Sequence, residues 1–245
     1  MSADECLKSA TDISKLGTIL TIWAHPDDET FCAGGIMATA VKNGQKVICV
    51  IATKGEIGTK NPKKWPPKKM GALRSKEVKE ALSILGVGEC YCLNYMDGAC
   101  VDVPEQEAIS RLRTVIKEYQ PDSILTFGPE GLTGHPDHSA VSKWTDKVLE
   151  SINKPPKVYH SVQTHEQYKR LEDADKKLNI FFNIDQPPLK NPEECGICYK
   201  LPREIGQLKY RAFAAMPSQT EKMFELFDEQ FICSALGTEA FVKAS

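Results

Sequence analysis

Thr18-Ile19-Leu20-Thr21-Ile22 is an apolar run, and Trp23-Ala24-His25-Pro26-Asp27-Asp28-Glu29 follows it directly. The run predicts a buried strand. A histidine, a proline and three carboxylates therefore stand together where that strand ends. Far along the chain, Gly134-His135-Pro136-Asp137-His138 follows the apolar run 123–127 in the same way. The two clusters hold three of the five histidines of the chain, and we interpret them as two halves of one metal site.

Strand and helix patterns alternate around these clusters over about the first 160 residues. We expect strands at 18–22, 47–52, 91–95, 123–127 and 158–160, and helices at 36–41, 73–85, 104–120 and 139–152. This alternation predicts an α/β fold, with a Rossmann-like, mostly parallel sheet and helices on both faces. Ligands of such sheets bind beyond the carboxyl ends of the strands, where both histidine clusters would lie.

The remaining segments are less regular. Residues 53–70 read as a long irregular loop, which we interpret either as a solvated basic loop or as a partial cover for a substrate. Beyond residue 160 the pattern weakens, with a strand expected at 180–184 and helices at 203–216 and 223–231. We expect a single domain over 1–245, with a polar lead-in at 1–17 and a less regular part at about 160–245.

The composition is that of a globular protein, with 41% hydrophobic and 26% charged residues. A net charge of −2 offers no electrostatic case for nucleic acid or for an acidic membrane surface. The apolar runs are too short for a membrane span, and acidic residues stand where a signal peptide would be positively charged. We therefore expect a cytoplasmic protein.

Nine cysteines occur mostly within apolar segments, which favours buried thiols in a reducing compartment over a disulfide framework. Cys195-Gly196-Ile197-Cys198 has the spacing of a redox or zinc pair. Because no second pair of this kind accompanies it, a loop with two thiols is the simpler interpretation.

The clusters contain the parts of a catalytic zinc site, which usually has three nitrogen or oxygen ligands and leaves one position for water. His25 and Asp28 are three residues apart across a proline turn, and His138 can supply the third ligand from a neighbouring strand end. Asp27 would then lie beside the metal as a free carboxylate, able to take a proton from water that zinc has acidified.

His135 remains on the other side of the predicted metal. Asp137 is available to orient its ring or to keep it protonated. A cationic imidazole there would stabilise an oxyanion and could protonate a departing amine. Ordinary explanations exist for single residues, since aspartates after strands often cap helices. Two His-Pro-Asp clusters at equivalent strand ends nevertheless favour metal-assisted hydrolysis of an acyl bond.

These residues strongly resemble the LmbE-like, or PIG-L-type, deacetylases. The resemblance rests on AHPDDE at 24–29 and GHPDH at 134–138 and extends from about residue 18 to 220. It implies a zinc enzyme that removes acetyl groups from N-acetylglucosamine units of larger molecules. It also implies the same zinc ligands, Asp27 as general base, and His135 as oxyanion stabiliser or acid.

Three weaker matches imply substrate-binding residues. Thr53-Lys54-Gly55-Glu56 resembles a Thr-x-Gly-Glu segment of the family. Arg74 stands where the family has a substrate-contacting arginine, and Asp97 matches an aspartate that binds sugar hydroxyls. An exposed helix arginine and a turn aspartate before glycine are the ordinary interpretations of the last two.

The chain departs from the family pattern at two positions. The family often carries a His-x-Ser-Gln element, whereas here Met216-Pro217-Ser218-Gln219 lacks the histidine. Some members place a mobile tyrosine two residues before the first histidine of the second cluster, where this chain has Thr133. Neither change removes a zinc ligand, but both put the contacts to the substrate in question.

The two clusters are also compatible with other functions. A metal-dependent esterase, phosphoesterase or other amidohydrolase could use the same scaffold, although phosphate chemistry often needs two metals. A dinucleotide-binding protein is disfavoured because no G-x-G-x-x-G follows the first strand. A non-catalytic sugar-binding protein would need no general base. The expected partner is a small amino-sugar conjugate whose aglycone could be an inositol, a malate, a lipid-linked inositol or another sugar. The oligomeric state, a homo-oligomer included, and the choice of zinc over another divalent ion stay open.

Overall fold

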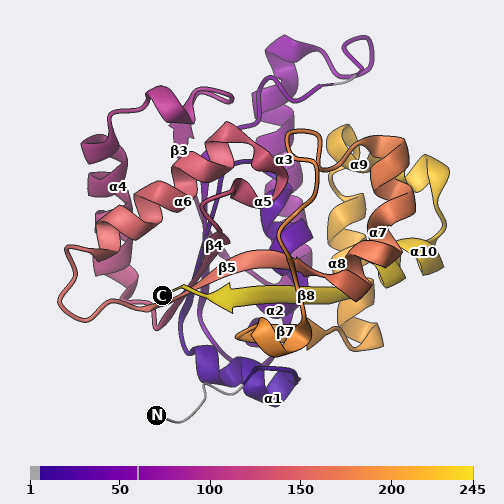
Figure 1. Ribbon diagram of the computed structural model, residues 1–245. Helices are drawn as coiled ribbons and strands as arrows, with labels where there is room; N and C mark the ends of the chain where they lie inside the picture. Colours follow the sequence, from indigo (N-terminus) through magenta and orange to yellow (C-terminus); the bar gives the residue numbers. More distant parts are fainter. Residues whose placement is uncertain (1–5, 60, 245) are drawn as a thin grey trace.

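The computed structural model describes residues 6–59 and 61–244 and is built on an eight-stranded sheet (Figure 1). The strand order is β3-β2-β1-β4-β5-β8-β7, and β6 pairs with β5. From β3 to β5 the strands are parallel, whereas β8 is antiparallel to both neighbours. The strands are β1 (Ile19–Trp23), β2 (Val47–Thr53), β3 (Glu89–Tyr95), β4 (Ser123–Phe127), β5 (Lys157–Thr164), β6 (Leu189–Lys190), β7 (Ile197–Lys200) and β8 (Thr238–Lys243).

Helices cover both faces of the sheet, so the predicted fold class is confirmed. α2, α3 and α8 pack against one another, while α4 packs against α6 on the other side (Figure 1). The longer helices are α2 (Asp28–Lys42), α3 (Pro67–Leu85), α4 (Glu105–Tyr119), α6 (Pro136–Leu149), α7 (His165–Leu178), α8 (Arg203–Ala214), α9 (Pro217–Leu226) and α10 (Glu229–Ala235). Short turns of helix occur at α1 (Ala10–Ile13), η1 (Ser14–Leu16), η2 (Cys100–Asp102), α5 (Gly131–Gly134) and η3 (Pro192–Glu194).

The position of β1 decides where the site can form. β1, β2 and β4 are buried along their whole length, as expected for strands covered on both faces. β1 lies between β2 and β4, with Ile19 paired to both Val47 and Ser123. The chain runs outward from β1 through β2 to β3 and then returns to β4 on the other side of β1. The carboxyl ends of β1 and β4 therefore flank the topological switch point, where such sheets bind ligands.

The helix after β1 begins earlier than predicted. It starts at Asp28, so Gly34 and Gly35 lie inside α2 instead of opening it. The amides of Gly35 and Ile36 donate to the buried Glu239 carboxylate, at 2.7 Å each. A Cβ on Gly35 would lie 2.3 Å from a Leu201 methyl, so close packing explains this glycine. Two other predicted helices also start earlier, at Pro67 and at Pro136, which puts His138 in the first turn of α6.

The less regular part differs most from expectation. The segment 180–184 is a turn after α7 and not a strand. There Phe181 is buried and its amide donates to Asp175, whereas Phe182 is exposed. The helix expected at 223–231 is wrong too, because α9 ends at Leu226 and the Asp228 side chain caps α10. The helix α7 and the strands β6, β7 and β8 were not predicted. The lead-in contains α1, and its first five residues lie outside the described residues.

Within residues 6–59 and 61–244, no helix combines the length and the apolar character needed to cross a bilayer.

Candidate metal centre

The two histidine clusters meet at the carboxyl edge of the sheet. His25 follows β1, and His138 opens α6 after β4, the strand beside β1. Nδ1 of His25 lies 3.1 Å from Nε2 of His138. The structure thus brings together His25 and His138, which are far apart in the chain and which we expected to belong to one site.

Asp28 lies beside these two nitrogens, with a different carboxylate oxygen nearest to each. Its carboxylate oxygens lie 3.6 Å from Nδ1 of His25 and 3.5 Å from Nε2 of His138. Ligand atoms about 2.0–2.1 Å from a tetrahedral zinc ion stand roughly 3.3 Å apart, so each of these separations is close to that of a pair of ligands on one ion. All three side chains are at most 12% exposed. Two nitrogens and one carboxylate form a donor set that suits zinc and also other divalent metals.

Hydrogen bonds behind each ring orient its ligand nitrogen. Nδ1 of His138 faces the Gly131 carbonyl at 2.8 Å, and the ring stacks on Phe127 with centroids 4.0 Å apart. Burial lowers the pKa of His138 to about 4, so the ring is neutral. These contacts assign the proton to Nδ1 and leave Nε2 free to bind a metal. Thr133, which stands where some family members have a tyrosine, makes a second contact to this Nδ1 through its hydroxyl oxygen, at 3.2 Å.

His25 is oriented by two buried carboxylates. Its Nε2 lies 3.0 Å from Asp97 and 3.2 Å from Asp137, which turns Nδ1 toward His138. Burial lowers the pKa of His25, but bonds with Asp137, Asp28 and Asp97 outweigh it and raise the pKa well above the ordinary value. A metal ion at Nδ1 would take the place of a proton there.

The Asp137 carboxylate is occupied by bonds that orient His25. Its carboxylate is fully buried and accepts the amides of Gly98 at 2.8 Å and Cys100 at 3.0 Å, besides its contact with His25. Burial raises its pKa, but the bond to His25 and the amides outweigh it and hold the pKa at about 2. The carboxylate therefore contacts the His25 ring and not the ring of His135, which we had expected it to orient.

His135 stands at the edge of the cluster. Its Nδ1 accepts the amide proton of Asp137 at 3.1 Å, and its ring lies edge-on to His25 at 4.7 Å between centroids. Burial, and then the nearby positive charge of His25, lower the pKa of His135. Nδ1 is thus an acceptor in a neutral ring with the proton on Nε2, in contrast to the cation that we had expected.

Asp27 has an unusual backbone. Its φ is 116°, a region that residues other than glycine seldom adopt, and such strain concentrates at functional sites. It stands at the N-cap position of α2, yet its side chain makes no capping bond. Its carboxylate lies 3.3 Å from Nη2 of Arg74 and is 28% exposed. Loss of hydration raises its pKa to about 7, although Arg74 acts against this shift. A pKa near neutrality suits a general base.

Glu29 is a residue whose importance we did not foresee. It is fully buried, and its carboxylate accepts the Asp27 amide at 2.9 Å and the Thr30 hydroxyl at 2.6 Å. Burial raises its pKa to about 7. The bond to the Asp27 amide stabilises the strained backbone. The local signal was Glu29 itself, an acid two residues beyond Asp27 in the first turn of the helix.

The three residues predicted to bind substrate are turned inward. Arg74 is 3% exposed and donates to Gly55 O at 3.0 Å and Pro26 O at 2.5 Å. Asp97 bonds His25 and also accepts the Ile57 amide at 3.0 Å. One oxygen of Glu56 accepts the Asp97 amide at 3.2 Å, while the other is buried without a partner among the described residues. Their expected contacts with a sugar stay a prediction.

The Ser and Gln of the altered C-terminal element support the same region. Both oxygens of Glu77 in α3 accept bonds from Ser218, one from its amide and one from its hydroxyl. Gln219 donates to the carbonyl of Gly58 at 2.9 Å. Met216, which replaces the histidine, is buried. The element therefore fixes α3 and the turn after β2, both of which contact Asp27 through Arg74.

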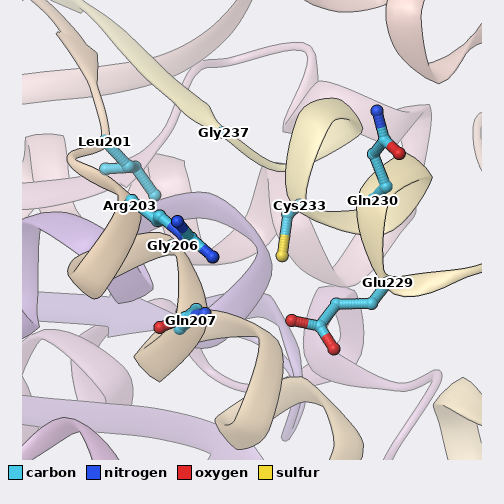
Figure 2. A pocket seen from close by; sticks show the side chains of 8 residues that line it. All are labelled: Leu201, Arg203, Gly206, Gln207, Glu229, Gln230, Cys233 and Gly237. Carbon is cyan, nitrogen blue, oxygen red and sulfur yellow. The ribbon is translucent and has the colours of Figure 1, made fainter.

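A cavity of about 390 Å³ lies elsewhere, between α8 and α10 (Figure 2). Figure 2 shows the side chains of Arg203, Glu229 and Cys233 directed toward it. None of the predicted site residues lines it. The cysteine pair is also separate. The two groups of side chains among residues 6–59 and 61–244 that could hold an ion are His25, His135 and His138, and His25, Asp97 and Asp137, and neither contains a cysteine or Asp28. The chemistry of the side chains therefore places the candidate site at the two strand ends.

Known proteins resemble the chain in sequence and in fold. Relatives include a 1D-myo-inositol 2-acetamido-2-deoxy-alpha-D-glucopyranoside deacetylase of Corynebacterium diphtheriae, 30% identical over 56% of this chain and 53% of its own length. A probable N-acetyl-alpha-D-glucosaminyl L-malate deacetylase 2 of Bacillus anthracis is 32% identical over 58% of this chain and 64% of its own. The matches thus span between half and two thirds of these relatives.

The solved structure of an N,N'-diacetylchitobiose deacetylase from Pyrococcus horikoshii matches with a TM-score of 0.64 and 21% identity. It covers 95% of this chain and 85% of that one, and at this identity it supports the fold alone. The family model described as PIG-L, GlcNAc-PI de-N-acetylase, matches residues 20–149, which include both histidine clusters. Because this segment is more than half of the 245 residues, the chain belongs to the PIG-L, or LmbE-like, family.

Proposed function

We propose that the protein is a metal-dependent hydrolase that removes the N-acetyl group from a small N-acetylglucosamine conjugate. Family membership supports this proposal, as do the relatives named as deacetylases of such conjugates. The observation that carries it is the convergence of His25, Asp28 and His138 with the Asp27 carboxylate beside them. A binding protein would have no use for a strained carboxylate whose pKa is near 7.

His25, Asp28 and His138 would hold the ion, zinc or another divalent metal. When bound, the ion supplies Lewis acidity, which polarises the acetyl carbonyl and acidifies the attacking water. Asp27 removes a proton from that water as its oxygen bonds to the carbonyl carbon. The Nε2–H of neutral His135 donates to the developing oxyanion. The C–N bond then breaks, and Asp27 returns its proton to the departing amine, giving acetate and a free amino sugar.

Acetate release from N-acetylglucosaminides by the zinc-loaded protein tests this proposal, with Asp27→Ala and Asp27→Asn assayed beside it. We expect both variants to bind zinc as the wild type does and to lose at least about 100-fold in kcat, the usual scale of general base catalysis. Activity that survives in Asp27→Asn would remove Asp27 from this role. Zinc binding with no acetate release from any substrate would instead place an esterase first.

A further inference from the structure

Two of the three polar residues predicted to recognise the substrate, Arg74 and Asp97, bond within the protein, whereas one oxygen of Glu56 has no partner among the described residues. The guanidinium of Arg74 bonds two carbonyls and contacts Asp27. Both oxygens of Asp97 have partners, the His25 ring and the Ile57 amide. Neither the Arg74 guanidinium nor the Asp97 carboxylate is therefore free to bind a carboxylate or hydroxyls of a ligand.

The exposed residues on the same turns are apolar. Among the described residues, five large apolar side chains are the most exposed: Ile57 at 65%, Met96 at 67%, Val101 at 59%, Phe182 at 55% and Leu226 at 47%. A single exposed apolar residue needs no explanation. The first four, however, belong to the segments that follow β2, β3 and α7 and that contact the candidate metal centre.

Ile57 and Met96 adjoin the residues that orient His25. The Ile57 amide bonds Asp97, and Met96 is the residue before Asp97. The Ile57 side chain also contacts the next turn, because a Cβ added to Gly98 would lie 3.0 Å from Ile57 Cδ1. Val101 follows Cys100, whose amide bonds Asp137. The turns that build the site from within thus present apolar side chains outside.

Phe182 reaches His135 from the opposite segment. Its ring lies edge-on to His135, with centroids 6.3 Å apart. The turn is held there by close backbone packing, since a Cβ on Gly134 would lie only 2.6 Å from the Asn183 carbonyl oxygen. Buried Phe181 anchors the turn in the core. Figure 1 shows this segment, between α7 and β7, running beside α5. Phe182 is therefore an exposed aromatic ring beside His135, the proposed oxyanion donor.

We propose that the group joined to the N-acetylglucosamine is apolar, an aromatic or aliphatic aglycone that packs on Phe182 and Ile57. This inference rests on the proposed function, whose polar site would hold the acetamide and the sugar. Sites for such ligands are mostly apolar with a few placed polar groups. A malate would need free cations, and an inositol would need free hydrogen-bonding groups, whereas the turns beside the site expose Ile57, Met96 and Phe182. Lys54 on the same turn and Lys63, Lys68 and Lys69 further along the loop are exposed cations among the described residues, and the test includes Lys54, which stands two positions before Glu56.

The test measures kcat/KM for acetate release from N-acetylglucosaminides that differ only in the aglycone. Methyl, phenyl, octyl, malate and inositol glycosides are compared in the zinc-loaded wild type and in Phe182→Ser, Ile57→Ser and Lys54→Ala. Leu226→Ser is the matched control, because it removes another exposed apolar side chain, which lies on α9. All four substitutions are at exposed positions, where folding should not depend on the side chain.

We expect kcat/KM for the phenyl or octyl glycoside to exceed that for the methyl glycoside by about tenfold, the effect of burying a few methylene groups. Phe182→Ser should reduce this ratio by about the same factor. Leu226→Ser should leave the ratio unchanged. If the malate glycoside has the highest kcat/KM, and Lys54→Ala removes that advantage, the proposal of an apolar aglycone is wrong. The proposed deacetylase function would not be affected by this result. Equal rates for methyl and phenyl glycosides would overturn it as well. No acetate from any glycoside would contradict the proposed function, and this inference with it.

Discussion

Nδ1 of His25 and Nε2 of His138 face one another across 3.1 Å, although 113 positions separate the two residues in the chain. This approach follows from the pairing of β1 with β4, which puts the two strand ends side by side. Each ring is oriented from behind, His25 by Asp97 and Asp137 and His138 by the Gly131 carbonyl. A metal ion between the rings would replace the contact in which Nδ1–H of protonated His25 faces the free Nε2 of His138.

Substitution of a ligand should abolish metal binding. In His138→Ala one of three ligands is lost, and we expect zinc affinity to fall by well over 100-fold, while β4 and α6 keep their structure. Competition with a chromophoric chelator measures the affinity, and circular dichroism checks the fold. Cys195→Ser is the control, since that thiol lies outside both metal-competent clusters of the described residues. Loss of zinc from Cys195→Ser, but not from His138→Ala, would indicate that the metal binds at the cysteine pair.

The carboxylate behind His25 should also affect the metal. We expect Asp137→Asn to weaken zinc binding by about 10- to 100-fold, the usual effect of removing a partner that orients a ligand. The reason is that a neutral amide holds the His25 Nε2–H less strongly than a carboxylate does. The same chelator competition measures it. Unchanged affinity, together with a large loss of activity, would instead return Asp137 to the predicted role beside His135.

Glu29 should act on the rate through Asp27. In Glu29→Ala the Asp27 amide loses its acceptor, so the strained backbone can relax and move the carboxylate. A displacement of about 1 Å in such a group costs about 100-fold in rate. We expect kcat to fall by about that factor, with KM and zinc stoichiometry little changed, and Glu29→Gln to recover part of it. Thr30→Val is the control, because it removes only the second bond to Glu29. An equal loss in Thr30→Val and Glu29→Ala would show that general packing, and not the Asp27 amide, matters.

The buried ion pair under α2 should dominate a stability measurement. Lys209 and Glu239 are 2.6 Å apart with side chains 2% and 1% exposed, and the pair bonds the backbone of α2 at Phe31, Gly35 and Ile36. We expect Glu239→Ala to lower the free energy of unfolding by about 3–5 kcal/mol, because it leaves the buried Lys209 ammonium without its counter-charge and two amides without an acceptor. Urea titration measures this. Lys222→Ala, which removes an exposed pair, should have no measurable effect. Equal midpoints for the two variants would contradict this account of α2.

Much of the sheet and the metal centre could be predicted, for identifiable reasons. The runs 18–22, 47–52 and 123–127 are continuous and apolar, and strands of that kind must be covered on both faces. A parallel sheet then brings the ends of β1 and β4 to one edge, so His25, Asp28 and His138 could be grouped without coordinates. Strand order and spacing were enough to propose this ligand set, which stays a prediction.

The orientation of the outer residues could not be predicted, because it depends on distant hydrogen bonds. Nothing near Arg74 in the sequence indicates that Pro26 and Gly55 supply its acceptors. The run 180–184 suggested a strand because periodicity cannot distinguish a strand from a turn with one buried and one exposed phenylalanine. The helix α7 was missed although Thr164 and Gln167 form a capping box, a local signal that was present in the sequence.

We propose that His25, Asp28 and His138 hold one metal ion and that Asp27 acts beside it as the base in hydrolysis of an N-acetyl amide bond. The most direct measurement is a titration of metal-depleted protein with zinc, following the rate of acetate release from an N-acetylglucosaminide. We expect the rate to be negligible at first, to rise in proportion to zinc and to reach its maximum at about one ion per chain, the capacity of one three-ligand site. Full activity before zinc is added, or a saturated metal site that releases no acetate, would contradict the account.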